Sequence, residues 1–358
     1  MRSVRVLVVD DSAVMRSLLR MVITSHPRLE LAGMAQDGPA ALNLLEQLKP
    51  DLVLLDIEMP QMNGLEVLEK IRERDQVVKV IMCSTLTRRG AGITMEALAR
   101  GAADYVAKPS AQHGVREGLA TLTNELIPKI LAQFSIETKA FTTPPVKRVI
   151  SPIRGEGHAV SAVVIGVSTG GPSALEKLLP ALPADFPIPI LIVQHMPQLF
   201  TALLAERLDS QSRVKVREAV AGTRPEAGTV DLARGDWHME VRSFPEKEGC
   251  WLRLTQAAPE QSCRPSVDVL FRSAASAYES SVLGVILTGM GSDGLDGCRA
   301  IRAAGGTIFV QDQASSAVWG MPGAVAEAGL ANRVLPLDAM ASEIVRTVSQ
   351  SRRSEVVA

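Results

Sequence analysis

Residues 163–175 read VVIGVSTGGPSAL. The apolar run at its start is typical of a buried strand, and Pro172 suits the beginning of a helix. Ser168 lies between the two, in the pattern Gly-x-Ser-x-Gly. Several hydrolases present a nucleophilic hydroxyl on such a strand-to-helix turn, because glycines let the backbone turn sharply and let a substrate approach the peptide N–H groups. The stretch therefore predicts an α/β domain in which Ser168 is a candidate nucleophile.

Length and composition indicate two domains and no general affinity for nucleic acid. The chain has 358 residues, which is long for a single hydrophobic core. Its formal net charge of −1 argues against nucleic-acid partners, and no apolar run is long enough for membrane insertion or a signal peptide. The four cysteines form no paired motif, so we expect reduced thiols and a cytoplasmic location.

Strand and helix patterns alternate in the first third of the chain, which predicts a parallel sheet in a first domain at 1–133. The expected strands are 4–9, 29–35, 51–56, 77–83 and 103–107, and the expected helices are 12–25, 38–48, 64–73, 90–101 and 114–133. The next segment, 134–158, is rich in proline and charge, without an apolar period, and predicts an extended linker.

A second α/β pattern occupies 159–348 and predicts a doubly wound, mostly parallel sheet. Its strands are expected near 160–167, 188–194, 282–288 and 306–310. Residues 213–255 carry short strand-like runs, and we expect them to form an antiparallel excursion. The last residues, 349–358, are expected to be a frayed C-terminal tail.

Acidic side chains stand at the strand ends of the first domain. Asp10 and Asp11 follow the first strand, and Asp56 ends the third. Because the carboxyl ends of parallel strands share one edge of a sheet, these carboxylates should converge there and attract Mg²⁺. Ser84 and Lys108 follow the fourth and fifth strands. Asp56 is therefore a candidate phosphoryl acceptor; the alternative is that the first two aspartates cap a helix and the third lies in a loop.

Residues 4 to about 125 resemble a response-regulator receiver domain, through the motifs VVDDS, LLDIEMPQMNG, CS and DYVAKP. The resemblance implies a flavodoxin-like (βα)5 fold and phosphorylation of Asp56. It implies contacts of Ser84 and Lys108 with the phosphoryl group, and a switching role for the aromatic side chain of Tyr105. It also implies the following ligands of Mg²⁺: Asp10, Asp11, Asp56 and the backbone carbonyl of Glu58.

Two more strand-end residues are candidates for a site around Ser168. His195 follows the apolar run PIPILIVQ, and Asp293 lies in the glycine-rich turn that ends SVLGVILTGMGSDG. A serine nucleophile needs a base and the base needs an orienting group, so we expect a triad of Ser168, His195 and Asp293. The backbone of Met290 could face an oxyanion. The alternatives are a loop histidine bonded to backbone and an aspartate that caps the helix after it.

Residues 160 to about 345 resemble the catalytic domain of the CheB family of chemotaxis methylesterases. The matching runs are VVIGVSTGGPSAL, VQHMP, CRPSVDVLF, GVILTGMGSDG, VWGMPGAV and VLPLD. The resemblance implies that Ser168 is the nucleophile, His195 the base and Asp293 the orienting residue. It places Thr169 and the backbone of Met290 beside the oxyanion.

The activity that this resemblance implies is removal of methyl groups from glutamate methyl esters on methyl-accepting chemotaxis receptors, with release of methanol. Deamidation of specific receptor glutamines often accompanies it. The implied phosphoryl donor is the chemotaxis histidine kinase CheA, and the esterase site needs no cofactor. Two alternatives stay open on the sequence: a receiver coupled to a non-catalytic binding module, and an esterase for another small ester.

Overall fold

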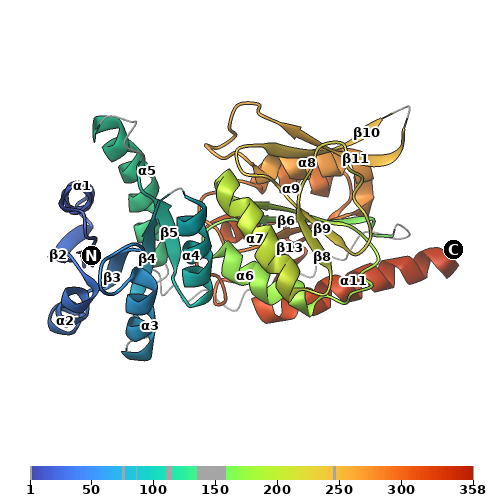
Figure 1. Cartoon of the computed structure of the whole chain (residues 1–358). Coiled ribbons are helices and arrows are strands. Elements are labelled where there is room, and N and C mark those ends of the chain that lie inside the picture. The colour runs from blue at the N-terminus through green and yellow to red at the C-terminus, as the bar shows by residue number, and fades with distance from the viewer. Residues whose placement is uncertain are drawn as a thin grey trace. The chain divides into compact units, whose positions relative to one another are not determined.

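Two units, each built on a parallel sheet, make up the chain (Figure 1). The first is Met1–Lys139 and the second is Ala140–Ala358. The computed structural model describes residues 2–74, 77–85, 87–109, 115–134, 159–244 and 247–357. Apart from Phe134, which ends a helix, the predicted linker at 134–158 lies outside the described residues.

The first unit has a five-stranded sheet in the order β2-β1-β3-β4-β5. Helices α1 and α5 pack together on one face, and α2, α3 and α4 follow one another on the other. This arrangement confirms the predicted flavodoxin-like (βα)5 fold. The elements are β1 (Val4–Val9), α1 (Ala13–Thr24), β2 (Leu29–Ala35), α2 (Gly38–Leu48), β3 (Leu52–Asp56), α3 (Gly64–Arg74), β4 (Lys79–Ser84), α4 (Arg88–Ala99), β5 (Asp104–Ala107) and α5 (Val115–Phe134).

The second unit has a seven-stranded sheet in the order β14-β13-β12-β6-β7-β9-β8, with every neighbouring pair parallel. The chain enters at β6 and builds the sheet outward on both sides, which confirms the doubly wound fold. The strands are β6 (Ala162–Val167), β7 (Ile190–Gln194), β8 (Lys215–Glu218), β9 (Thr229–Leu232), β12 (Val282–Ile286), β13 (Thr307–Gln311) and β14 (Arg333–Leu335).

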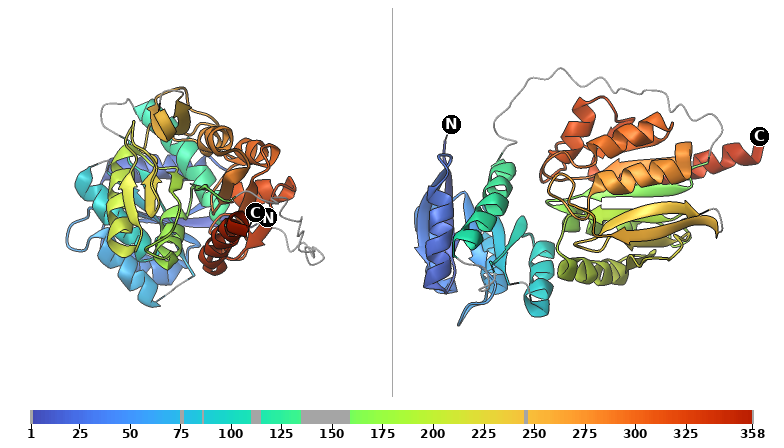
Figure 2. Two further views of the ribbon diagram at one scale, coloured as in Figure 1. Left: turned by 90° about the vertical axis from the view of Figure 1, so that its right-hand side faces the viewer. Right: turned by 90° about the horizontal axis from the view of Figure 1, so that it is seen from above.

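Helices cover both faces of this larger sheet (Figure 2). On one face α6 contacts α7 and α11, and on the other α9 contacts α8 and α10. An antiparallel hairpin of β10 (His238–Phe244) and β11 (Lys247–Thr255) packs on α8. The helices are α6 (Gly171–Leu178), α7 (Gln198–Gln211), α8 (Val267–Tyr278), α9 (Leu295–Ala303), α10 (Met321–Glu327) and α11 (Leu337–Val357), with 3₁₀ turns at Leu179–Ala181 and Glu279–Ser281.

The prediction of an antiparallel excursion at 213–255 was half wrong. Only the β10–β11 hairpin is antiparallel, whereas β8 and β9 extend the main sheet as parallel strands. All four residues of β9 are buried, and one of them is Asp231. Its carboxylate accepts a hydrogen bond of 2.6 Å from Arg217 of β8. The charged pair interrupted the apolar run by which a buried parallel strand is recognised.

The predicted frayed tail at 349–358 was also wrong. Helix α11 continues to Val357. Its Ser351 hydroxyl accepts a hydrogen bond of 3.0 Å from the backbone N–H of Val160, and Arg352 donates to the carbonyl of Pro187 at 3.1 Å. The helix is thus held at Ser351 and Arg352 against the segments that precede β6 and β7. The sequence of residues 349–358, which is mostly polar, gives no sign of these two hydrogen bonds.

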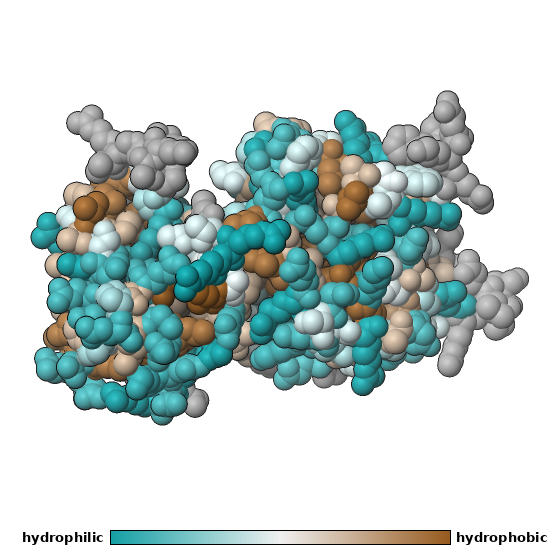
Figure 3. Space-filling view, in the orientation of Figure 1, coloured by the Kyte–Doolittle hydropathy of each residue, from teal (hydrophilic) through white to brown (hydrophobic). Residues whose placement is uncertain are grey.

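Mostly hydrophilic side chains cover the face of the molecule shown in Figure 3. Most of the large apolar residues are buried in the two cores, and Val14 and Val220 are among those that are exposed. In the part of the chain that the structure describes, no helix combines the length and the hydropathy needed to cross a bilayer.

A close contact between the central strand and a helix joins the fold to the site. Gly166 in β6 lies under Val267, the first residue of α8, and a Cβ on this glycine would come within 2.4 Å of the valine side chain. The missing side chain therefore lets the start of α8 approach the sheet.

Gly166→Ala should destabilise the second unit by about 1–3 kcal/mol, because the core would have to expand around the new methyl group. All three tryptophans, Trp237, Trp251 and Trp319, lie in that unit, so urea unfolding followed by tryptophan fluorescence reports on it alone. The control in the same unit is Ser342→Ala at an exposed position of α11, where a surface substitution should change stability by no more than about 0.5 kcal/mol. An unchanged midpoint for Gly166→Ala would contradict the close contact.

Candidate functional site

Ser168 lies at the point where the strand order of the large sheet reverses. It follows β6, and its backbone N–H donates to the carbonyl of Thr288, beyond the end of β12, at 3.0 Å. From the other side, Gln194 at the end of β7 donates from Nε2 to the Ser168 carbonyl, also at 3.0 Å. Clefts at such reversal points are the usual ligand sites of open α/β sheets. The serine is thus held from both neighbouring strands.

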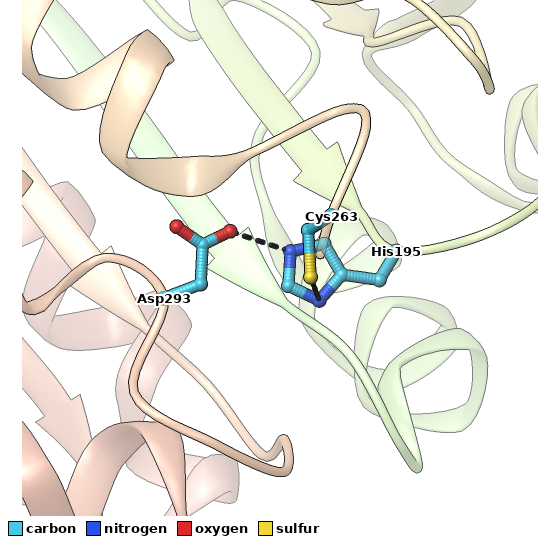
Figure 4. A group of neighbouring side chains, drawn as sticks. All are labelled: His195, Cys263 and Asp293. Carbon is cyan, nitrogen blue, oxygen red and sulfur yellow. Dashed lines mark hydrogen bonds and ion pairs between the residues drawn. The ribbon is translucent and has the colours of Figure 1, made fainter. Parts of the chain in front are cut away.

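His195 and Asp293 are in direct contact (Figure 4). The Nε2 atom of His195 lies 2.7 Å from Oδ2 of Asp293. The His195 side chain is 14% exposed, and that of Asp293 is 3% exposed. The backbone N–H of His195 donates to the carbonyl of Val167 at 3.2 Å, which sets the histidine beside the residue that precedes Ser168. The two predicted partners therefore meet at one edge of the sheet.

The serine and the histidine are neighbours without a direct hydrogen bond. The second ring nitrogen of His195, Nδ1, lies 3.7 Å from Sγ of Cys263. Within the described residues, no hydrogen bond joins the Ser168 hydroxyl to the imidazole. Such contacts are often long in a free enzyme and tighten when substrate binds. The serine–histidine contact stays a prediction.

The start of α8 holds the carboxylate of Asp293. The Ser266 hydroxyl donates to Oδ1 at 2.9 Å, the N–H of Asp268 to Oδ1 at 3.0 Å, and the N–H of Val267 to Oδ2 at 2.7 Å. The two backbone N–H groups lie at the positive end of the helix dipole. Burial raises the pKa of Asp293, but the hydrogen bonds from His195 and from α8 outweigh it and lower the pKa overall. Asp293 therefore does not cap α9, whose N-cap is Gly294.

His195 has an altered affinity for protons. Burial of the imidazole lowers its pKa, but hydrogen bonds with Asp293 and Cys263 outweigh burial and raise the pKa to about 9. A pKa of about 9 means that at neutral pH both ring nitrogens carry a proton in the free protein. Removing the carboxylate removes the strongest cause that favours the protonated ring.

The predicted oxyanion residues lie on loops that pack against Ser168. Gly289, which precedes Met290, approaches so closely that a Cβ there would come within 2.9 Å of the Ser168 Cβ. The Thr288 hydroxyl donates to the carbonyl of Thr169 at 2.9 Å and accepts from the N–H of Val318 at 3.0 Å. The Thr288 hydroxyl thus connects its own loop, after β12, with the loops that contain Thr169 and Val318.

Sequence reasoning missed the residues that support this site. Gln194 and Thr288 bridge the loops, and Ser266 holds the orienting carboxylate. Their signal in the sequence is weak: Gln194 and Thr288 are polar residues at the ends of apolar runs, and Ser266 is a polar residue before a helix. Polar residues at the strand ends of a parallel sheet indicate a site at that edge of the sheet. They do not indicate which groups they will hydrogen-bond to in the folded protein.

The acidic residues of the first unit converge as predicted. Carboxylate oxygens of Asp10, Asp11 and Asp56 lie within 4.8 Å of one another. The Nζ atom of Lys108 is 2.8 Å from Oδ2 of Asp10 and 2.7 Å from Oδ1 of Asp56. The alternative, that Asp10 and Asp11 cap the first helix, is wrong. The N-cap of α1 is Ser12, whose side chain accepts a hydrogen bond from the N–H of Met15.

Asp56 suits a cation and a phosphoryl group. Burial, and after it the charge of Asp10, raises its pKa to about 6 against the opposing effect of Lys108. Its Oδ2 atom is buried without a hydrogen-bond partner in the described structure. Three clustered carboxylates that share the single positive charge of Lys108 are a ligand set that suits Mg²⁺. Glu58 belongs to the same loop, and its N–H lies 3.3 Å from Oδ1 of Asp56.

Ser84, a predicted contact of the phosphoryl group, and Tyr105, the predicted switch residue, are both buried. The Ser84 hydroxyl, at the end of β4, accepts from Thr94 Oγ1 at 2.7 Å and donates to the Thr85 carbonyl at 3.2 Å. The Tyr105 ring points inward, with the Lys129 Nζ 4.8 Å from its centroid. Lys129 also donates to the Tyr105 carbonyl at 2.7 Å. A switching role would require these contacts to change.

Comparison with known proteins identifies the family. The model of the CheB methylesterase family matches residues 163–344, and that of the response regulator receiver domain matches residues 6–120. A protein-glutamate methylesterase/protein-glutamine glutaminase from Trichodesmium erythraeum is 44% identical over 356 residues, which cover 96% of this chain and 99% of that protein.

The chain belongs to the CheB methylesterase family. A protein of the same description from a Nocardioides species is 47% identical over 367 residues, covering 100% of this chain and 99% of that protein. The crystal structure of the Thermotoga maritima CheB methylesterase catalytic domain is similar with a TM-score of 0.51 and 41% identity, and covers 52% of this chain and 97% of that chain. These similarities confirm the receiver–esterase organisation expected from the motifs.

Titration of His195 followed by ¹⁵N NMR should give a pKa of about 9, well above the usual 6.5 of histidine. In Asp293→Asn the pKa should fall, because the ring proton loses its anionic partner. The loss of this pairing should reduce stability most between pH 3.8 and 6.5, the ordinary pKa values of the two groups; the difference should fade as the pH passes 9, where the wild-type ring is neutral, and as the pH falls below 3.8, where Asp293 takes up a proton. The His195 signal is assigned as the one that is missing from the spectrum of His195→Gln. A His195 pKa that is the same in Asp293→Asn as in wild type would contradict the pairing.

Proposed function

We propose that this chain is a phosphorylation-activated serine hydrolase. Its substrates would be glutamate methyl esters on methyl-accepting chemotaxis receptors, and its products methanol and the free glutamate. The observation that carries the proposal is the buried His195–Asp293 pair beside Ser168, at the reversal point of the sheet. A family of receiver-regulated methylesterases supplies the substrate class.

The first half of the reaction transfers the acyl group to the enzyme. The Ser168 oxygen attacks the ester carbonyl while Nδ1 of His195 takes the hydroxyl proton, since Nε2 is engaged with Asp293. The carbonyl oxygen becomes an oxyanion, which the backbone N–H groups of Thr169 and Met290 would stabilise. The C–O bond to the methoxy group then breaks, and His195 returns the proton to the departing methanol.

The second half regenerates the enzyme. Water attacks the acyl-serine, gives its proton to His195, and the Ser168 oxygen leaves as a hydroxyl group. A glutamine side chain would form the same acyl-enzyme with ammonia as the leaving group. One site therefore suffices for demethylation and for deamidation. Because the ring nitrogen must be unprotonated to act, its raised pKa implies a rate that rises with pH toward about 9.

The receiver would control this reaction through Asp56. Asp10, Asp11, Asp56 and the backbone carbonyl of Glu58 would hold Mg²⁺, which neutralises charge on the incoming phosphoryl group. Lys108, already paired with the two buried aspartates, and Ser84 would contact the phosphoryl oxygens, and Tyr105 would respond as the switch residue. The donor would be the histidine kinase of the chemotaxis system, CheA.

Ser168→Ala should abolish methanol release from methylated receptor, because the loss of a covalent nucleophile in a triad costs on the order of 10⁶ in rate. The matched control is Ser342→Ala on α11, whose exposed hydroxyl donates to the Ala339 carbonyl of the same helix. Retention of more than a few per cent of the wild-type rate by Ser168→Ala would exclude the serine mechanism. Equal turnover of a generic small ester would instead argue against receptors as the substrate.

Asp56→Asn should prevent activation of the full-length chain by a small phosphoryl donor in Mg²⁺. Wild type should gain roughly 5–150-fold in rate, the range of a coupling free energy of 1–3 kcal/mol. Asp37→Asn is the control, since asparagine caps a helix as well as the aspartate that caps α2 does. Mass spectrometry should find the phosphoryl label on Asp56, and a label on another residue would refute the assignment.

A further inference from the structure

The thiol of Cys263 lies against His195 and has no part in the reaction described above. The residue belongs to the segment between β11 and α8, and its Sγ atom is 3.7 Å from Nδ1 of His195. Figure 4 shows the thiol next to the imidazole, whose other nitrogen faces Asp293. Donor atoms of these three residues lie within 4.8 Å of one another. Thiol, imidazole and carboxylate are the side chains that bind Zn²⁺.

The distances among these three side chains indicate that His195 and Cys263 could bind a zinc ion directly, whereas Asp293 could only hydrogen-bond to the histidine. Tetrahedral zinc with a Zn–N bond of 2.0 Å and a Zn–S bond of 2.3 Å sets nitrogen and sulfur about 3.5 Å apart. The observed 3.7 Å between Nδ1 and Sγ is close to that separation. The 2.7 Å between Nε2 and Asp293 is too short for two ligands of one zinc ion and suits a hydrogen bond. A carboxylate that accepts from the other ring nitrogen is the common outer partner of a zinc-bound histidine.

We propose that His195 and Cys263 form an inhibitory binding site for a thiophilic divalent cation of the zinc class. Binding forms bonds to the Nδ1 lone pair and to the thiolate, and releases the thiol proton and any proton on Nδ1. The metal then occupies the nitrogen that must accept the Ser168 proton, so the enzyme cannot start its reaction. The inhibitory part of this inference rests on the proposed function, whereas the binding part does not.

The other cysteines do not offer this pairing. Cys83 and Cys298 are fully buried, and burial raises the pKa of both thiols, which disfavours the thiolate that a metal needs. Cys250 is partly buried, and its Sγ atom faces the Ala277 carbonyl at 3.9 Å. Since two protein ligands leave the remaining positions to water, we expect reversible binding that a chelator removes.

Cobalt(II) provides a direct test of binding in the full-length protein. After treatment with EDTA and return to excess Mg²⁺, wild type titrated with Co²⁺ should show a thiolate-to-cobalt absorption band in the near ultraviolet. The carboxylates of the receiver cannot produce such a band. Cys263→Ser should lose it, and Cys250→Ser, the control at the other partly buried thiol, should keep it. Lack of the band in wild type, or its persistence in Cys263→Ser, overturns the site.

Zn²⁺ titration of methanol release tests inhibition, with each variant compared with its own zinc-free rate. Half-inhibition of Cys263→Ser should require at least about 10–100-fold more zinc than wild type or Cys250→Ser, because even the loss of a group that only hydrogen-bonds a metal ligand costs that much affinity. Equal sensitivity of wild type and Cys263→Ser overturns the proposal. A cobalt band without zinc inhibition overturns the inhibitory part. Failure of zinc-free wild type to release methanol overturns the proposed function but leaves the cobalt result intact.

Discussion

The buried carboxylate of Asp293 is the group on which the arrangement of the second unit's site depends. It accepts hydrogen bonds from the start of α8 and from His195. A buried charge is stable only when it is paired and hydrogen-bonded, so the end of β7, the loop after β12 and the first turn of α8 must come together. Gly166 allows this by leaving room for Val267. The close packing of α8 on β6 is therefore also what brings the start of α8 to the Asp293 carboxylate.

The two units use buried aspartates in opposite ways. Asp293 accepts hydrogen bonds from the start of α8 and from His195, and its pKa is lowered. Asp56 shares one lysine with Asp10, keeps a buried oxygen without a hydrogen-bond partner, and has a pKa raised to about 6. The first environment favours a permanent anion that orients a neighbour. The second favours a group that gains from a cation and from reaction with a phosphoryl group.

Much of the architecture, and the placement of the candidate site residues at strand ends, could be predicted from local patterns. The strands before Ser168, His195 and Asp10 are apolar runs that end in a polar residue, and a parallel sheet brings such ends to one edge. The prediction failed where a strand was short and carried a charge, as in β9 with Asp231. It also failed at the end of α11, where the Ser351 hydroxyl accepts from the Val160 N–H. Neither pairing has a local signature.

The sequence by itself determined the alternating elements, the two α/β units and the residue types at their strand ends, because periodicity and turn chemistry are local properties. Only the tertiary structure decided which strands are neighbours and which donors hold Asp293. It also brought Cys263 to His195, 68 positions away in the chain. Such contacts depend on strand order and on the approach of α8 to the sheet. These are set by packing over the whole unit, which no short stretch of sequence encodes.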